Sequence, residues 1–454
     1  MRSVKSYQTS SNSNLISMPQ PLTARRSAAI SGRVKVPGDK SISHRALILA
    51  GLATGRTRIE GLLEADDVLA TARAVEALGA SVVRDGDVFE VLGQGVGGLS
   101  APDGVLDFGN SGTASRLMLG VLAGYPMPVS LTGDASLCRR PMSRVLKPLM
   151  EMGLLVEDDR ETLPLTVVGT QDLLPIVYEL PVPSAQVKSA ILLAGLHAPG
   201  RTTVIEPLPT RDHTERMLRY FGAEVDVETR ADGSRAVTVT GDAELRGAHV
   251  IVPGDPSSAA FLVAAALICP GSDLTIENVL LNPTRTGFFD TLQEMGADIA
   301  VLDQRDAAGE PVGDLRIRSS ALRGVRVPPE RAPSMIDEYP VLAALAAFAE
   351  GETRMEGSAE LKVKESDRLA ATAAGLAACG VTARIEGDDL IVTGTGAVRG
   401  GGTVATEMDH RIAMAFLTLG LGAEEPVAVD DIAMIATSFP AFVPLMTGLG
   451  ARLG

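Results

Sequence analysis

One glycine-centred pattern recurs six times along the chain, each time where an amphipathic segment ends, as in LGASV at Gly79. The six glycines are Gly79, Gly153, Gly222, Gly296, Gly380 and Gly450. They are separated by 74, 69, 74, 84 and 70 residues. A period of this length is too long for an ordinary solenoid repeat, so each unit is expected to contain several helices and strands.

Each unit has the same internal order of segments. A polar turn is followed by a strongly apolar segment such as FLVAAALI, then by a strand such as GRTTVIEPL, and then by an amphipathic segment that ends at the glycine. The first segment is apolar on nearly all sides and predicts a buried helix, whereas the second has one apolar stripe and predicts a helix packed under a sheet. A chain of 454 residues is too long for one ordinary core. We therefore predict an α/β protein with two domains of three units each, with sheets outside and helices inside.

Two stretches of similar sequence mark where the chain is expected to pass between these domains. VPGDKSISHR at residues 36–45 is echoed by VPGDPSSAAF at residues 252–261. We predict interdomain crossings near residues 36–39 and 252–255. The expected domains are residues 39–254 with repeats 1–3, and residues 31–38 plus 255–454 with repeats 4–6.

The N-terminal segment has a different composition. Residues 1–30 contain no acidic residue and are rich in Ser, Asn, Gln, Lys and Arg, a composition that resembles a transit peptide. Because the segment has no amphipathic pattern, a flexible tail outside the fold is the favoured interpretation.

The composition argues against several classes of partner. The formal net charge is −15 and aromatic residues make up 3% of the chain, so neither a basic face for nucleic acid or membrane nor a stacking platform for bases is expected. The longest apolar run, residues 259–269, is too short to span a bilayer. The three cysteines, Cys138, Cys269 and Cys379, lie far apart, which is typical of a reducing cytoplasm. We predict a cytoplasmic protein that binds neither nucleic acid nor membrane.

Cations occupy the starts of the predicted buried helices. If these helices run in the same direction within a domain, their N-termini share one face, where free N–H groups and the helix dipole attract anions. A cation is unfavourable in a first turn unless an anion lies beside it. Five side chains have this placement: Lys40, Arg45, Arg116, Lys188 and Arg411. Other polar residues at these starts are, taken one at a time, typical N-caps: Ser41, Asn110, Ser184 and Ser257. The cations predict an anionic partner.

Two acids, Asp337 and Glu365, occur among the residues expected to bind anions, which also include Lys364 and Arg368. Glu365 and Arg368, at i and i+3, could form an ordinary surface pair. In a cationic cleft, however, ionised carboxylates are suited to moving protons. No His, Cys and Asp cluster with metal-ligand spacing is apparent, so chemistry on a phosphorylated substrate is expected to need no metal.

Taken in order, the polar motifs resemble the signature series of one family. They are PGDKSISHR, GNSGTASR, RRP, PSAQVKSA, TRDHTE, IDEYP, KESDR and DHRIAM, and they run from about Val34 to the C-terminus. The series is similar to that of 5-enolpyruvylshikimate-3-phosphate (EPSP) synthases. NPTRTGFFDTLQEMGADI and APSMIDEYP resemble the bacterial subgroup called class II. A single motif of this kind would be weak, but the ordered set is highly specific.

The resemblance implies a fold, a reaction and a set of partners. The fold is two inside-out α/β barrel domains, β-prism-like, each of three repeated units with buried parallel helices. The reaction transfers the enolpyruvyl group of phosphoenolpyruvate to the 5-hydroxyl of shikimate 3-phosphate and releases phosphate, on the route to aromatic amino acids. No cofactor is needed, a monomer is expected, and the domains are expected to close on the substrate.

The resemblance also implies roles for individual residues. Lys40, Asp337 and Glu365 would be catalytic, with Asp337 bonded to the 5-hydroxyl and Glu365 exchanging a proton with the methylene carbon. The residues expected to bind shikimate 3-phosphate are Lys40, Ser41, Arg45, Ser184, Ala185, Gln186, Arg211, Asp337 and Lys364. Those expected to bind phosphoenolpyruvate are Lys40, Asn110, Gly112, Arg140, Gln186, Arg368 and Arg411. One departure is that Thr437 and Ser438 stand in a region where many members of the family carry a Lys.

Two other interpretations remain open at this point. The related UDP-N-acetylglucosamine enolpyruvyl transferase uses a loop Cys several residues before an Arg-Pro pair, whereas Cys138 lies only two residues before Arg140. A non-catalytic protein that binds phosphorylated ligands or RNA ends is a further alternative, against which the net charge of −15 and the paired acids count.

Glyphosate, which occupies the phosphoenolpyruvate pocket of sensitive members of the family, is an expected inhibitor. Some tolerant class II members carry Ala at the position of Gly112. Because Gly112 has no side chain, the resemblance implies a sensitive enzyme. The alternative is that Gly112 only eases a tight helix start.

Overall fold

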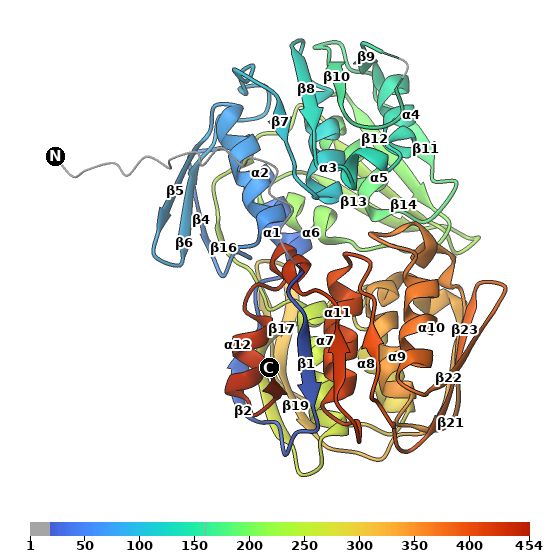
Figure 1. Ribbon diagram of the computed structural model, residues 1–454. Coiled ribbons are helices and arrows are strands. Elements are labelled where there is room, and N and C mark those ends of the chain that lie inside the picture. Colours follow the sequence, from blue (N-terminus) through green and yellow to red (C-terminus); the bar gives the residue numbers. More distant parts are fainter. Residues whose placement is uncertain (1–18, 159) are drawn as a thin grey trace.

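The computed structural model describes residues 19–158 and 160–454. It consists of two stacked halves, with the N-terminal half above the C-terminal half in Figure 1. Each half has its own hydrophobic core. One cluster of buried side chains is formed almost entirely by residues 42–252, and the other by residues 259–451 with three residues from the segment 24–36.

The N-terminal half contains three units, each with a buried helix and an amphipathic helix. The buried helices are α1 (Lys40–Leu52), α3 (Gly112–Leu122) and α5 (Ala185–Gly195). The amphipathic helices are α2 (Asp66–Ala77), α4 (Ser143–Met152) and α6 (His213–Tyr220). The strands are β3 (Ala53–Thr54), β4 (Arg56–Glu60), β5 (Ser81–Asp85), β6 (Val88–Leu92), β7 (Leu106–Asp107), β8 (Pro128–Thr132), β9 (Leu155–Val156), β10 (Leu165–Val168), β11 (Val177–Glu179), β12 (Arg201–Glu206), β13 (Val225–Thr229), β14 (Arg235–Thr240), β15 (Leu245–Arg246) and β16 (His249–Ile251).

The C-terminal half repeats this plan. Its buried helices are α7 (Pro256–Ile268), α9 (Tyr339–Ala346) and α11 (His410–Gly420), and its amphipathic helices are α8 (Gly287–Glu294), α10 (Arg368–Ala378) and α12 (Phe442–Gly448). Its strands are β1 (Leu22–Arg25), β2 (Ser31–Lys35), β17 (Asp273–Leu280), β18 (Asp298–Ala307), β19 (Glu310–Arg318), β20 (Arg326–Val327), β21 (Glu350–Met355), β22 (Thr382–Glu386), β23 (Asp389–Thr395), β24 (Thr403–Val404), β25 (Val427–Val429) and β26 (Arg452–Leu453).

The described residues form six four-stranded sheets that share one pairing pattern. In each, a short edge strand runs parallel to the next strand, and the two remaining pairs are antiparallel, as in the orders β16-β4-β6-β5 and β2-β17-β19-β18. The other sheets are β7-β8-β10-β9, β11-β12-β14-β13, β20-β21-β23-β22 and β24-β25-β1-β26. The repeated pattern, with helices inside and sheets outside, confirms the predicted fold class of six units in two inside-out α/β halves (Figure 1).

Small residues allow the buried helices to approach closely. A Cβ atom at Gly120 of α3 would lie 2.2 Å from the carbonyl oxygen of Ala190 in α5, so this contact requires glycine. Helix α7, with the sequence PSSAAFLVAAALI, is buried from Pro256 to Leu267. Although α7 is apolar, neither it nor any other helix of the described residues is long and apolar enough to cross a membrane.

The structure corrects the predicted tail at its C-terminal end. Residues Leu22–Arg25 form strand β1, which pairs antiparallel with β25 and β26 in the last sheet, whereas the tail was expected to extend to residue 30. In that sheet β1 takes the position that every other unit fills with a strand of its own. Four residues are too few to show a periodic pattern, and the partner strands are about 400 residues away. Residues 1–18 of the predicted tail lie outside the described residues.

The two VPGD turns lie side by side. The backbone N–H of Asp39 donates to the carbonyl oxygen of Pro253 at 2.7 Å, and that of Asp255 donates to Pro37 at 2.9 Å. The turns therefore form a short antiparallel bridge, with one buried cluster on each side of it.

One buried cation, Arg285, contacts both turns. Its guanidinium lies 2.6 Å from Asp39 Oδ2 and 3.0 Å from Asp255 Oδ1, and its side chain is 3% exposed. Burial would raise the pKa of Asp39, but attraction by Arg285 outweighs it and holds that pKa well below its usual range. Burial and repulsion by Asp39 raise the pKa of Asp255 to about 6. Each carboxylate also caps a helix, because Asp39 accepts from Ile42 N–H at 2.8 Å and Asp255 from Ser257 N–H at 3.0 Å.

Replacing Arg285 by Leu is expected to destabilise the protein strongly, because two carboxylates would stay buried without their cation. Removing one partner of a buried ion pair costs about 3–5 kcal/mol. Urea unfolding followed by circular dichroism measures the free energy of unfolding. The matched control is Arg318→Leu, whose ion pair with Asp298 is about half exposed and whose loss should cost less than about 1 kcal/mol. An equal loss in the two variants would contradict the role given to Arg285.

Candidate active site

Asp337 lies where the two halves meet and is surrounded by cations. Its side chain is contacted by Arg211 at 2.6 Å, Arg368 at 3.1 Å, Lys364 at 3.8 Å and Arg411 at 3.9 Å. Arg211 belongs to the N-terminal half, whereas the other three belong to the C-terminal half. Burial would raise the pKa of Asp337, but attraction by these four cations outweighs it and holds the pKa well below its usual range. Two of these cations also contact other carboxylates, since Arg368 pairs with Glu365 and Asp409 and Arg411 lies 3.7 Å from Glu338.

Glu365 pairs with Arg368 three residues later. This is not a surface pair, because the side chain of Arg368 is 1% exposed and also contacts Asp409 at 2.7 Å. Burial would raise the pKa of Glu365, but attraction by Arg368 and by Arg140 holds it well below its usual range. The side chain of Glu365 nevertheless remains 26% exposed. It is an ionised carboxylate that a ligand can reach.

Two arginines in the N-terminal half are contacted only by neutral groups. Arg140 Nη2 donates to Asn110 Oδ1 at 2.7 Å. Arg116 donates to Gln186 Oε1 at 3.0 Å and to the carbonyl oxygen of Pro141 at 3.1 Å. Burial and repulsion by Arg140 lower the pKa of Arg116 to about 10, which leaves it charged at neutral pH. Within the described part of the chain, neither arginine has a carboxylate partner, so both can receive an anion.

The starts of α3 and α5 are joined beside these arginines. Gln186 Nε2 donates to Thr113 Oγ1 at 3.0 Å, and Ser184 caps α5 by accepting from Val187 N–H at 3.4 Å. Ala185 is the first residue of that helix. Free N–H groups at such a start attract phosphate and carboxylate groups.

Arg45 on α1 is buried, with one bond from each guanidinium nitrogen. It donates to Ser41 O at 2.9 Å, to Thr214 Oγ1 at 2.7 Å and to Ser189 Oγ at 2.7 Å. Burial lowers the pKa of Arg45 to about 10. These three acceptors are neutral, so its charge is not matched by a directly bonded anion.

The structure corrects the prediction for Lys188. This side chain is fully buried and contacts Glu206 at 2.9 Å and Glu215 at 2.7 Å. Its charge is balanced by protein carboxylates, not by an anionic ligand. Both glutamates come from later segments, β12 and the first turn of α6, so the pairing is not visible in the sequence around Lys188.

Two acids that pair with predicted residues were not themselves predicted as site residues. Asp67, in the first turn of α2, pairs with Lys40, and Asp409 caps α11 by accepting from Arg411 N–H at 2.9 Å. Carboxylates are common at helix starts for capping and dipole reasons alone. The sequence therefore carried no signal that would set these two apart.

Gly112, the first residue of α3, faces the arginines described above. A Cβ atom there would lie 2.9 Å from Arg116 Nη1 and 3.3 Å from Arg140 Nη1. A methyl group at this position would therefore make close steric contact with both guanidinium groups. Because Gly112 has no side chain, the guanidinium groups of Arg116 and Arg140 can lie this close to the start of α3.

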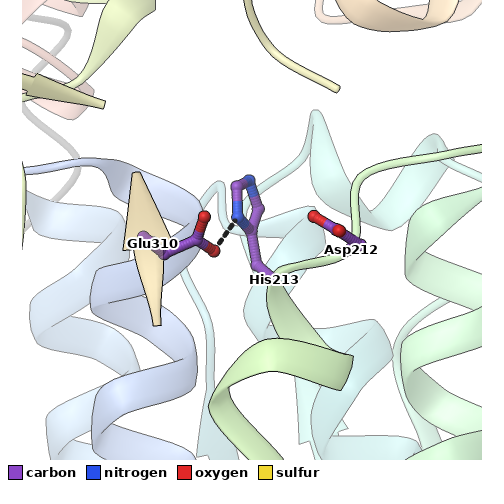
Figure 2. Close-up of side chains that lie close together, drawn as sticks. All are labelled: Asp212, His213 and Glu310. Atoms are coloured by element: carbon purple, nitrogen blue, oxygen red, sulfur yellow. Dashed lines mark hydrogen bonds and ion pairs between the residues drawn. The ribbon is translucent and has the colours of Figure 1, made fainter. Parts of the chain in front are cut away.

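A cluster of Asp212, His213 and Glu310 was not expected from the sequence. Their ligand-type atoms lie within 4.8 Å of one another, and Figure 2 shows His213 Nδ1 directed at Glu310. Three of the four carboxylate oxygens accept a hydrogen bond from Asn282 or Arg216, and the fourth contacts His213 at 2.7 Å. With protein donors and the cation of Arg216 already in place, these residues do not suit a metal ion.

Comparison with known proteins identifies the family of this chain. The family model for EPSP synthase (3-phosphoshikimate 1-carboxyvinyltransferase) matches residues 24–446. The 3-phosphoshikimate 1-carboxyvinyltransferase of Methylorubrum extorquens is 62% identical over 96% of this chain and 98% of the relative, and that of Brucella canis is 58% identical over 96% and 97%. The solved EPSP synthase of Acinetobacter baumannii matches with a TM-score of 0.86 and 42% identity over 96% of this chain and 99% of that chain. The chain therefore belongs to the EPSP synthase family.

Proposed function

We propose that this chain transfers the enolpyruvyl group of phosphoenolpyruvate to the 5-hydroxyl of shikimate 3-phosphate and releases phosphate. One observation carries the proposal. Two ionised acids, Asp337 and Glu365, lie beside cations that come from both halves of the protein. Both substrates are anions, and guanidinium groups suit phosphates and carboxylates. The relative that is 62% identical over nearly the whole chain carries the name of this activity.

Shikimate 3-phosphate is assigned to the face formed by the starts of α1 and α5 and by the loop before α6. The assigned residues are Lys40, Ser41, Arg45, Ser184, Ala185, Gln186, Arg211, Asp337 and Lys364. The start of α5 supports a phosphate near Ser184 and Gln186. Arg45 supports a second anionic group, because its bonded partners are neutral.

Phosphoenolpyruvate is assigned to the junction of the two halves. The assigned residues are Lys40, Asn110, Gly112, Arg140, Gln186, Arg368 and Arg411. Arg140 supports this position because only neutral groups contact it. Arg411 approaches from the other half, where its Nη1 donates to the carbonyl oxygen of Asp337 at 3.2 Å. The region of Thr437 and Ser438 offers no Lys to this pocket.

The reaction divides into an addition and an elimination. In the first step the 5-hydroxyl oxygen bonds to C2 of phosphoenolpyruvate and C3 takes a proton. In the second step C3 gives up a proton, the double bond re-forms, and phosphate leaves with the proton that came from the hydroxyl. Glu365 is proposed to carry the C3 proton, Asp337 to accept the hydrogen bond of the 5-hydroxyl, and Lys40 to contact both substrates. Because Glu365 is ionised without ligand, bound anions are expected to raise its pKa until it can hold that proton.

We further propose a cytoplasmic monomer that needs no cofactor and is inhibited by glyphosate. The three cysteines are unpaired, which suits a reducing compartment. Cys138 is half-buried and its Sγ lies 3.3 Å from the carbonyl oxygen of Gly133, toward which it can donate. No observation favours Cys138 as the loop cysteine of a UDP-N-acetylglucosamine enolpyruvyl transferase.

Phosphate release tests the proposed reaction. The purified protein should release phosphate from phosphoenolpyruvate when shikimate 3-phosphate is present, and should release none above background with UDP-N-acetylglucosamine. Shikimate 3-phosphate carries a phosphate monoester that suits the start of α5. Release with UDP-N-acetylglucosamine alone would replace the proposal by its alternative.

Removing either proposed proton-handling group should slow turnover. Glu365→Gln and Asp337→Asn are each expected to lower kcat by about 10²-fold or more, because an amide cannot exchange the proton. Steady-state phosphate release measures kcat, and circular dichroism checks the fold. The control is Glu352→Gln, an exposed change on β21 that should leave kcat within about twofold of wild type. Near-normal kcat in both site variants would rule out the acid–base assignment.

Glyphosate inhibition tests the role of Gly112. Gly112→Ala is expected to raise the inhibition constant for glyphosate more than it raises the KM for phosphoenolpyruvate. Glyphosate is longer than the substrate, and the added methyl group would displace Arg116 and Arg140 around it. Titrations of both proteins with the inhibitor measure the two constants. If both proteins are equally sensitive, Gly112 serves only the helix start and the pocket argument is wrong.

A further inference from the structure

The loop that carries Arg211 is held by contacts to the opposite half of the protein. It connects β12 to α6, and its Arg211 contacts Asp337 across the junction at 2.6 Å. The next two residues, Asp212 and His213, are buried and also contact the C-terminal half. Figure 2 shows His213 at the start of its helix, facing Glu310 on a neighbouring strand. Three consecutive side chains, two at the end of the loop and one at the start of α6, therefore bond across the interface.

Asn282 is the central group of these contacts. It follows β17, and its Nδ2 donates to Asp212 Oδ1 at 2.6 Å and to Glu310 Oε2 at 2.7 Å. Its Oδ1 accepts from the N–H and the hydroxyl of Thr284 at 2.9 and 2.7 Å. Because the oxygen is occupied by donors, the two N–H bonds are directed at the carboxylates. One fully buried amide thus joins the loop of one half to strand β19 of the other.

Three further contacts support the same loop. The other oxygen of Glu310 lies 2.7 Å from His213 Nδ1. Arg216, one turn along α6, donates to Asp212 Oδ2 at 2.9 Å and to the carbonyl oxygen of Gly309 at 2.9 Å. Buried polar networks of this kind are sensitive to the loss of any member, and in return they fix one geometry.

We propose that Asn282 and Glu310 are positioning residues that hold the loop of Asp212 and His213 so that Arg211 reaches the substrate. They act through Arg211 and touch no substrate themselves. The inference rests on the proposed function, in which Arg211 binds shikimate 3-phosphate. It gives a role to the segment NPTRTGFF, whose Asn282 joins the Arg211 loop and whose Arg285 joins the two VPGD turns.

The test is Asn282→Asp, which keeps the size of the side chain but turns a carboxylate oxygen toward Asp212 and Glu310. Titration calorimetry measures the Kd of shikimate 3-phosphate, and steady-state kinetics measures both KM values. We expect the Kd and the KM of shikimate 3-phosphate to rise about tenfold or more, while the KM of phosphoenolpyruvate changes less than about twofold. The matched control is Asn278→Asp on β17, which can still accept the bond from Arg305 and should leave all constants near wild type.

A double-mutant cycle separates positioning from general stability. In an Arg211→Ala background, Asn282→Asp should add little further loss, because a residue that acts through Arg211 has no effect once Arg211 is absent. If Asn282→Asp does not fold, Asp212→Ala removes the loop side of the same bond and should give the same pattern. Unchanged affinity for shikimate 3-phosphate, equal effects on both substrates, or full additivity with Arg211→Ala would overturn the proposal. A wild type that binds shikimate 3-phosphate without releasing phosphate would instead contradict the proposed function alone.

Discussion

The guanidinium of Arg285 lies between the carboxylates that open two helices of different halves, Asp39 before α1 and Asp255 before α7. Each VPGD turn must bring a helix start to the interface while the chain passes between the two cores. Two buried carboxylates this close would repel each other, and the cation makes the arrangement stable. The near-identical turns are therefore two halves of one structural unit, and only the first is followed by a cation, Lys40.

The fixed junction explains why charges from distant parts of the sequence can meet. Arg211 from one half and Arg368 from the other both contact Asp337, and attraction by these cations keeps the acid ionised. Arg116 and Arg140 add positive charge that only neutral groups contact. In the proposed function, an anionic substrate supplies the negative charge that these two arginines lack. The same attraction lowers the pKa of Glu365, so the proposed mechanism links substrate binding electrostatically to proton transfer.

Much of the fold could be predicted from the sequence because the repeat is long and regular. Six apolar segments predict six buried helices, and the polar residues before them predict the face of the candidate site. The features that the sequence did not predict share one physical cause. Each depends on residues that pair with partners far away in the sequence. Strand β1 completes the last sheet, Lys188 is neutralised by Glu206 and Glu215, and Asn282 joins Asp212 to Glu310. No local sequence pattern reveals such partners. A motif such as NPTRTGFF indicates that its residues have a specific role, but not which distant residues they contact.

The central claim is that phosphoenolpyruvate is held between the two halves by cations from both. A crystal structure of the Glu365→Gln variant with both substrates tests this directly. The account predicts phosphoenolpyruvate within hydrogen-bond distance of Arg140 from the N-terminal half and of Arg368 or Arg411 from the C-terminal half. It also predicts the phosphate of shikimate 3-phosphate at Ser184. Phosphoenolpyruvate bound by one half alone, or away from Arg140, would contradict the account.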